Sequence, residues 1–271
     1  MSTKRHRSRS ASTPAAAPPV ALVTGAAHRI GREIALALAR DGYDVAVHYG
    51  RSRAAALATV ADIRRTGRRA CAVKRDLAVA SGLRSMLEQC AGELGEVTCV
   101  VNSASLFEFD RAEDFDAARL TRHMRVNVAA PVLLARHLHA RIAKGGQGVV
   151  INLLDQKLWN PNPDFLSYTL SKAALCSATG LLARALAPKL RVVGIAPGIT
   201  LPAPGQSLRH FEQAARLSAL GYPSAPEDIA QAVVYLARAR AVTGTTLLVD
   251  GGQHLVPSER DVMFLRPGAR R

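Results

Sequence analysis

The feature that most constrains the fold of this chain is a regular alternation of short apolar runs with longer amphipathic stretches. Seven apolar runs recur along the 271 residues, and six helix-like segments separate them. Short apolar runs bounded by glycine, proline or polar residues predict buried strands. The predicted strands are residues 20–23, 44–49, 70–73, 99–101, 149–153, 192–196 and 246–249.

Strands that alternate with helices predict an α/β domain built on one parallel sheet. Right-handed crossovers place helices on both faces, so we expect a doubly wound sheet of about seven strands. No repeat or linker interrupts the pattern, which predicts a single domain over residues 20–256, with ligands bound beyond the carboxyl ends of the strands. The predicted helices include Ile34 and Leu38 and then cover residues 54–66, 82–93, 115–143, 165–187 and 226–239, with a break near Pro131.

Both ends of the chain depart from this pattern. Residues 1–19 are rich in arginine, serine, alanine and proline and contain no acidic residue, and residues 257–271 are again polar and basic. We therefore predict two basic tails, the first of them disordered. The first tail lacks the apolar stretch of a secretory signal, although its composition superficially resembles an organelle transit peptide.

The net charge is unusual, because 36 Lys and Arg against 21 Asp and Glu give +15. Such a charge fits binding to nucleic acid, anionic lipid or an anionic ligand, and equally a solvated basic surface. Only 4% of the residues are aromatic and no nucleic-acid motif occurs, so we expect no nucleic-acid partner. No apolar run is long enough for a membrane span, and the four cysteines lack metal-ligand spacing. A cytoplasmic protein without a metal site is expected.

A glycine-containing loop joins the first predicted strand to the first helix. Gly25 permits a tight turn, and Gly31 permits close contact between helix and strand. The free N–H groups at the helix start, together with the helix dipole, would favour a pyrophosphate. The same spacing is found in ordinary strand-to-helix turns, so both interpretations stay open.

A second motif carries the chemistry. Tyr168 and Lys172 are four residues apart in a predicted helix and therefore face the same side. An ammonium near a phenol should lower the pKa of Tyr168 from about 10, so that it can move a proton near neutral pH. Asp155 ends the fifth predicted strand, and Asn127 lies in the longest predicted helix. These four residues are the candidate catalytic group, although the spacing can arise by chance and Asp155 could instead cap the following segment.

These motifs resemble those of the short-chain dehydrogenase/reductase family over residues 20–255. The family has a Rossmann-type fold, a TGxxxGxG phosphate loop and a catalytic S-x12-Y-x3-K pattern. Here Arg29 replaces the middle glycine and Asp155 replaces the serine, and both departures resemble the pteridine reductase branch. The resemblance implies an NADPH-dependent reductase of a pterin or dihydropterin, assembled as a homotetramer.

The resemblance also implies roles for the catalytic group. Hydride would pass from the nicotinamide to a ring carbon, and Tyr168 would donate the proton. Lys172 would lower the pKa of Tyr168 and hold the ribose, and Asn127 would anchor a relay water. Asp155 would orient the pterin, because a carboxylate accepts hydrogen bonds from amino and ring N–H groups and, when protonated, can act as an acid.

The segment after the second predicted strand bears on the choice between NAD and NADP. No carboxylate stands there to bind a ribose hydroxyl, whereas His48, Arg51 and Ser52 offer a lining suited to the 2′-phosphate of NADP. Family motifs after later strands supply further contacts. The candidate cofactor residues are Gly25, Arg29, Ile30, Gly31, His48, Arg51, Ser52, Asp76, Leu77, Asn102, Ser103, Ala104, Tyr168, Lys172, Pro197, Gly198 and Thr200.

On the substrate side, the resemblance implies that Phe107 stacks on the pterin and that residues 201–221 form a mobile lid. The candidate substrate residues are Arg29, Ser105, Phe107, Asp155 and Tyr168. Two other functions stay open. The first is reduction of another carbonyl or imine substrate, which Asp155 disfavours. The second is a non-catalytic basic binding protein on the same fold, which the intact catalytic group disfavours.

Overall fold

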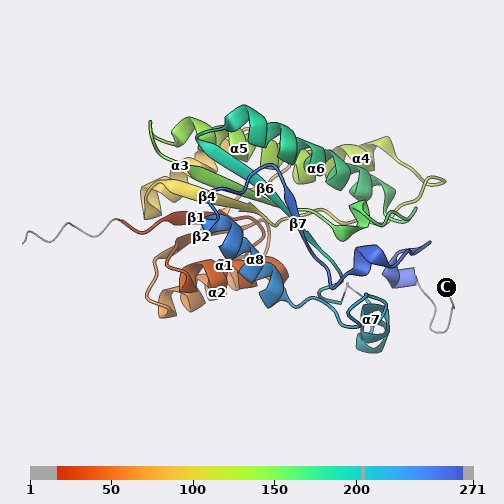
Figure 1. Cartoon of the computed structure of the whole chain (residues 1–271). Coiled ribbons are helices and arrows are strands. Elements are labelled where there is room, and N and C mark those ends of the chain that lie inside the picture. Colours follow the sequence, from red (N-terminus) through yellow and green to blue (C-terminus); the bar gives the residue numbers. More distant parts are fainter. Residues whose placement is uncertain (1–16, 203–204, 265–271) are drawn as a thin grey trace, which may run out of the picture.

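The seven predicted strands form one parallel sheet in the computed structural model, which describes residues 17–202 and 205–264 (Figure 1). The strand order is β3-β2-β1-β4-β5-β6-β7. β1 pairs with β2 on one side and with β4 on the other, so the winding reverses between β1 and β4. This confirms the predicted doubly wound sheet. The strands are β1 (Val20–Val23), β2 (Asp44–Tyr49), β3 (Ala70–Lys74), β4 (Val97–Asn102), β5 (Gly148–Leu153), β6 (Leu190–Pro197) and β7 (Thr246–Val249).

Helices cover both faces of the sheet (Figure 1). One layer consists of α1 (Arg29–Arg40), α2 (Arg53–Arg65) and α8 (Pro226–Arg238). The other consists of α3 (Gly82–Leu94), α4 (Ala117–Met124), α5 (Ala130–Arg141) and α6 (Leu166–Leu186). The short helix α7 (Leu208–Ala215) lies apart from both layers, near the C-terminal segment. Because the sheet is covered twice, every residue of β1, β2 and β5 is buried.

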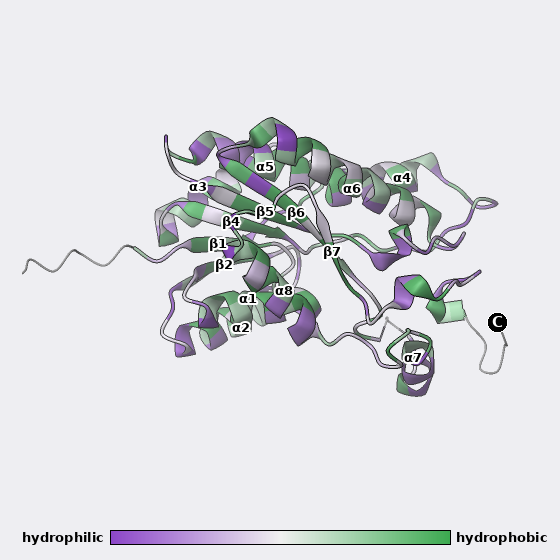
Figure 2. Cartoon of the chain, in the orientation of Figure 1, coloured by the Kyte–Doolittle hydropathy of each residue, from purple (hydrophilic) through white to green (hydrophobic). Residues whose placement is uncertain are grey.

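The two faces of the sheet carry separate, mainly aliphatic cores. In Figure 2 the central strands are coloured mainly as hydrophobic, whereas the helices alternate between hydrophobic and hydrophilic residues. Leu38 of α1 is fully buried on one face and Leu87 of α3 on the other. Burying one such side chain contributes about 1.5–3 kcal/mol to folding. Within the described residues, no helix combines the length and the apolar character that crossing a membrane requires.

The predicted long helix is interrupted close to Pro131. The interruption is a π-helical turn over Arg125–Ala129, which separates α4 from α5. Pro131 lies in the first turn of α5, where a missing N–H group is tolerated. The interruption predicted near Pro131 is therefore confirmed, but it consists of the π-helical turn and not of a kink at the proline, and this turn brings Asn127 toward α6.

The boundaries of the predicted tails also need correction. The carbonyl of Pro19 accepts a hydrogen bond from the Asp44 N–H at 2.9 Å, so the fold begins at Pro19. At the other end, residues 258–264 pack on the domain and include a 3-10 helix over Val262–Phe264. Arg260 of this segment pairs with the buried carboxylate of Asp164. The other tail residues, 1–16 and 265–271, and Pro204 of the predicted lid lie outside the described residues.

Candidate active site

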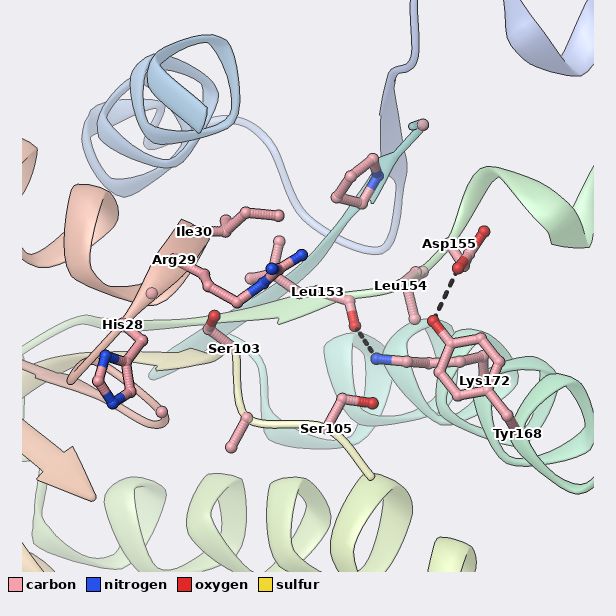
Figure 3. Close-up of a pocket in the computed structure, with 15 residues that line it drawn as sticks. His28, Arg29, Ile30, Ser103, Ser105, Leu153, Leu154, Asp155, Tyr168 and Lys172 are labelled. Carbon is pink, nitrogen blue, oxygen red and sulfur yellow. Dashed lines mark hydrogen bonds between the residues drawn. The ribbon is translucent and has the colours of Figure 1, made fainter. Parts of the chain in front are cut away.

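A cavity of about 460 Å³ opens at the carboxyl ends of the strands, beside the point where the winding reverses (Figure 3). It is lined from β1 and α1, from the loop after β4, from the end of β5, from α6 and from the end of β6. The lining residues are Gly25, His28, Arg29, Ile30, Gly31, Ser103, Ala104, Ser105, Leu153, Leu154, Asp155, Tyr168, Lys172, Pro197 and Gly198. The fold thus brings together motifs that are far apart in the sequence.

The loop between β1 and α1 is shaped by its two glycines. Gly25 has a φ of +66°, and a Cβ there would lie 3.0 Å from the Cα of Ala104. A Cβ on Gly31 would lie 2.4 Å from the carbonyl oxygen of Gly25, which no real side chain could do. The N-cap residue His28 makes no capping hydrogen bond to any described residue. The first N–H groups of α1 are therefore available to an anionic ligand.

His48 supports this loop from beneath. Its side chain is 2% exposed, its Nδ1 accepts a hydrogen bond from the Gly25 N–H at 3.1 Å, and its Nε2 lies 3.1 Å from the Arg75 carbonyl oxygen. One neutral tautomer satisfies both contacts, and burial lowers the pKa of the ring. The expectation that His48 lines a phosphate pocket is therefore corrected, because both nitrogens are engaged and the side chain positions the loop.

Thr24 is a residue that the sequence interpretation did not single out. Its hydroxyl accepts hydrogen bonds from the N–H groups of Ser103 and Ala104, both at 3.0 Å, and donates to the Val101 carbonyl at 3.3 Å. Thr24 therefore ties the loop after β1 to the loop after β4. Its place directly before Gly25 was the only sequence signal for this role.

Arg29, which replaces the middle glycine of the family motif, has a positive φ. Its φ of +53° is left-handed, which costs a residue with a side chain about 1–2 kcal/mol. Its guanidinium lines the cavity and donates to the carbonyl of Pro202 at 3.0 Å. Arg29 thus links the phosphate loop to the start of the predicted lid, which contains α7.

The remaining residues predicted on the adenosine side lie at loop positions outside the cavity lining. Arg51 and Ser52 are exposed at the start of α2, and Ser52 caps that helix without a side-chain bond to any described residue. Asp76 accepts a hydrogen bond from the Ala78 N–H at 2.9 Å and so forms a tight turn, while Leu77 is buried. Asp76 does not cap a helix, because α3 begins only at Gly82.

Three of the four candidate catalytic side chains, those of Asp155, Tyr168 and Lys172, lie together at the end of β5 (Figure 3). The Tyr168 hydroxyl donates to Asp155 Oδ2 at 2.7 Å, and Asp155 Oδ1 accepts from the Lys157 N–H at 2.8 Å. Lys172 Nζ donates to the Leu153 carbonyl at 2.7 Å. Asp155 therefore caps the following turn and also contacts Tyr168. Its role toward a substrate stays a prediction.

Burial dominates the electrostatics of this group. It raises the pKa of Asp155, an effect partly opposed by the Lys157 N–H and the Tyr168 hydroxyl. Burial and the neighbouring Asp155 carboxyl raise the pKa of Tyr168 well above its usual 10. Burial also lowers the pKa of Lys172 to about 8.

The expectation that Lys172 lowers the pKa of Tyr168 is therefore corrected for the cofactor-free protein. The ammonium of Lys172 donates to a carbonyl, and the phenol of Tyr168 faces a carboxyl group instead. Because the pKa of Tyr168 is raised, its hydroxyl keeps its proton at neutral pH. That state is the one required of a proton donor.

Two further buried side chains hold the segments around α6 together. Asn127 Nδ2 donates to Ser171 Oγ at 2.9 Å and to the Leu106 carbonyl at 3.0 Å, and its Oδ1 accepts from the Leu106 N–H at 2.8 Å. Asp110 accepts from the Ser167 N–H at 3.0 Å and caps α6 from another segment. Sequence analysis missed Asp110, since its contact with Ser167 spans 57 residues. The relay water assigned to Asn127 stays a prediction.

Two more predicted cofactor residues, Asn102 and Thr200, also lie outside the cavity lining. Asn102 Nδ2 donates to Asn152 Oδ1 at 2.8 Å, and its own Oδ1 is buried without a hydrogen-bond partner among the described residues. Thr200 is 7% exposed and donates to the Gly198 carbonyl at 2.8 Å. Gly198 itself must be glycine, because a Cβ there would lie 2.7 Å from the Cβ of Asp250.

The side of the site that is predicted to hold the substrate is aromatic. The Phe107 ring stacks on Phe165 with centroids 4.3 Å apart and meets Tyr168 edge-on at 4.7 Å. Phe107 nevertheless remains 44% exposed. It does not line the cavity described above, so it lies beyond Tyr168 rather than within the enclosed space.

Residues 25–254 match a protein-family model described as enoyl-(acyl carrier protein) reductase. A solved structure of FolM alternative dihydrofolate reductase 1 from Brucella canis, complexed with NADP, is 39% identical with a TM-score of 0.85, and the match covers 90% of this chain and 96% of that one. LugOII, a promiscuous reductase that catalyses keto-reduction at C1 during lugdunomycin biosynthesis, is 35% identical with a TM-score of 0.82 and coverage of 88% and 98%. An uncharacterized oxidoreductase from Methylorubrum extorquens is 35% identical over an alignment of 241 residues, and the match covers 86% of this chain and 96% of that protein.

Proposed function

Because this chain belongs to the short-chain dehydrogenase/reductase family, we propose that it is an NADPH-dependent reductase whose substrate is a pterin or dihydropterin. The chain is an oxidoreductase, and NADP(H) is its cofactor, in keeping with the NADP-bound relative. The family includes reductases of other substrates, such as LugOII. The choice of substrate therefore depends on the site itself.

The residues present fit this cofactor. The glycine cradle formed by Gly25 and Gly31 and the uncapped start of α1 would hold the pyrophosphate. Arg51 and Ser52 would hold the 2′-phosphate, because Arg51 has no ion pair or hydrogen bond to another described side chain. When bound, the nicotinamide supplies the hydride.

The observation that supports a pterin is the hydrogen bond between Tyr168 and Asp155. A serine hydroxyl at the position of Asp155 would have one O–H group to donate to a carbonyl oxygen, whereas a buried carboxyl group of raised pKa has two oxygens that accept hydrogen bonds and can also carry an exchangeable proton. A pterin presents an amino group, ring N–H groups and imine nitrogens to such a partner. An aliphatic ketone presents only one oxygen.

The side chains then have distinct roles. Reduction of a ring C=N bond adds hydride to the carbon and a proton to the nitrogen. Tyr168 supplies that proton, passed through Asp155 to the ring nitrogen. Lys172 uses one N–H on the Leu153 carbonyl and has two further N–H groups for a ribose. Asn127 holds the Leu106 backbone against α6, which fixes the floor of the site.

A panel of pterins, folates, ketones and imines, each assayed for NADPH oxidation, tests this proposal. We expect the highest kcat/KM for a pterin or dihydropterin. Turnover of ketones alone would favour the second candidate function, that of a ketoreductase. The similarity to LugOII supports this second candidate. No turnover of any compound would favour a non-catalytic binding protein.

We also propose a homotetramer in the cytoplasm. Helix α6 exposes Leu170 by 44% and Leu181 by 71%, and exposed apolar side chains on a long helix favour burial against another copy. All four cysteines are free thiols, as a reducing compartment would require. Light scattering at micromolar concentration should give four times the 28.8 kDa of the chain, and the mass of one chain would contradict the assembly.

A further inference from the structure

The C-terminal arm, defined as residues 258–264, is fixed to the domain by a buried carboxylate. Asp164 is 1% exposed and accepts hydrogen bonds from Arg260 Nε at 2.7 Å and Nη2 at 2.8 Å. It also accepts one from the Asp261 N–H at 2.8 Å. Bidentate pairing of an arginine with a buried carboxylate fixes both position and orientation. The arm is thus a built element of the domain.

A second contact connects the arm to the catalytic group. Lys157 is buried, and its Nζ donates to the Asp164 carbonyl at 2.5 Å and lies 3.4 Å from Asp261 Oδ2. The backbone N–H of the same lysine donates to Asp155. Lys157 therefore contacts both the Asp261 carboxylate of the arm and the Asp155 carboxyl group, which in turn contacts Tyr168.

A third contact is aromatic. Phe264 of the arm lies 5.0 Å from Phe109 and 5.9 Å from Phe165, measured between ring centroids. Phe165 stacks on Phe107, whose ring meets Tyr168 edge-on. We call these four phenylalanines the aromatic wall. It runs without a gap from the catalytic tyrosine to the arm.

The composition of the aromatic wall argues for a ligand. The chain has only six phenylalanines, and four of them gather here, while the two cores beside the sheet are mainly aliphatic. Phe107, Phe109 and Phe264 keep 44%, 39% and 36% of their surface exposed. Rings placed for core stability would be buried, whereas exposed rings beside a reactive group offer faces to a flat ligand.

We propose that the C-terminal arm is part of the substrate site, with Phe264 completing the aromatic wall on which a flat, multi-ring substrate rests beyond Tyr168. Arg260 is then a positioning residue that acts through Asp164, and Phe264 is a specificity-determining residue. The 3-10 helix of the arm also contacts α7 (Figure 1). That the flat substrate is a pterin rests on the proposed function; the role of the arm does not.

The test measures binding of flat probes to the protein loaded with NADP⁺, so that no turnover is needed. The probes are biopterin and phenanthrenequinone, and the small diketone diacetyl is the comparison ligand. Binding is followed by the fluorescence of Trp159, the single tryptophan of the chain. Trp159 lies close to the arm in the structure, because the adjacent Asn160 donates a hydrogen bond to the carbonyl of Val256, two residues before the arm begins. The variants are Arg260→Ala, Phe264→Ala and Phe264→Tyr.

We expect Arg260→Ala and Phe264→Ala to weaken binding of the flat probes by about three- to tenfold, which corresponds to the loss of one aromatic contact. Phe264→Tyr keeps the ring and should bind as the parent does. The affinities for diacetyl and NADP⁺ should change by less than about twofold. The matched control is Arg238→Ala, which removes an equivalent bond to Asp41, 2.7 Å long, between α8 and the end of α1. It should leave probe binding unchanged.

Several outcomes would overturn the proposal. Unchanged affinity for both flat probes in Arg260→Ala and Phe264→Ala would show that the arm lies outside the substrate site. A parent protein that binds neither flat probe would show that the aromatic wall holds no flat ligand. Equal losses for diacetyl and the flat probes would show that the arm has no preference for a flat ligand and would contradict the role of Phe264 in specificity. Binding of phenanthrenequinone that depends on Phe264, with no affinity for biopterin, would support the arm and contradict the pterin assignment.

Discussion

The two halves of the candidate active site, one proposed to hold the cofactor and the other the substrate, are built in different ways. The cofactor half, formed by the Thr24–Gly31 loop and residues 103–104, is made chiefly of backbone brought close by glycines and fixed by Thr24 and His48. The substrate half, formed by Asp155, Tyr168, the aromatic wall and the C-terminal arm, is made of side chains from segments up to about 150 residues apart. A ligand common to a family can be held by backbone, whereas a specific one requires particular side chains.

This contrast has an energetic side. In the cofactor half, a single added carbon atom would collide with backbone, so the structure tolerates almost no change there. In the substrate half, buried charges and exposed rings create a site whose chemistry depends on protonation. We therefore expect substitutions in the substrate half to lower kcat and substitutions in the cofactor half to lower stability.

The largest effect is expected in the substrate half. Tyr168→Phe removes the hydroxyl that donates to Asp155 but keeps the ring, and kcat should fall by about a hundredfold or more because proton transfer is lost. The Kd of NADPH and the thermal midpoint should stay close to the parent values. A variant that kept more than about a tenth of the parental kcat would show that another group donates the proton.

In the cofactor half, we expect a substitution to lower the stability of the fold. Gly31→Ala places a Cβ 2.4 Å from the Gly25 carbonyl oxygen, and overpacking of this kind costs about 1–3 kcal/mol of stability. NADPH binding should weaken with it. The control is Gly92→Ala in α3, where a Cβ would meet nothing within 4 Å and better helix propensity should add about 0.5–1 kcal/mol. Equal melting temperatures for both variants would contradict the tight loop.

The cofactor half also contains one side chain that should discriminate between cofactors. Arg51→Asp replaces an exposed cation, and the loss of a charged pairing of about 1.5–3 kcal/mol should weaken NADPH binding about tenfold or more. Binding of NADH should be kept or improved, and kcat with saturating cofactor should change little. Titration of both cofactors by fluorescence checks this, and equal NADPH affinity before and after the change would refute it.

A smaller effect concerns pH. Burial lowers the pKa of Lys172 to about 8 in the folded protein, while in the unfolded chain it is about 10.4. Between these values the unfolded state binds more protons, so the free energy of unfolding should rise with pH. Lys172→Met removes this contribution. Denaturant unfolding of the cofactor-free proteins from pH 8 to pH 10 should show the parent gaining stability relative to the variant, and parallel curves would contradict the buried ammonium.

The two halves also differed in how far the sequence could predict them. The apolar run Asp44–Tyr49 matched its strand in both bounds, because strand periodicity is a local property. The glycine spacing and the pair Tyr168 and Lys172 located the cavity, since parallel strands end at one edge of the sheet. The bond between Asp164 and Arg260 spans 96 residues, and no local pattern encodes such a contact.

The orientation of the His48 side chain is another feature that could not be predicted from the sequence. Its position at the end of β2 was predicted, but the sequence alone could not show that both ring nitrogens bond to backbone groups beneath the loop. The π-helical turn at Asn127 was likewise hidden, because it differs from an α-helix only by one additional residue per turn.

The most direct test of the substrate assignment is Asp155→Ser, assayed in parallel on a pterin and on simple ketones. If Asp155 accepts hydrogen bonds from the pterin and passes the proton from Tyr168, pterin reduction should fall by about a hundredfold or more. Ketone reduction should survive or rise, because serine is the residue that the family uses at this position, and NADPH affinity should stay nearly constant. Pterin reduction by Asp155→Ser at the parental rate would show that the carboxyl group has no role toward the substrate and would contradict the pterin assignment.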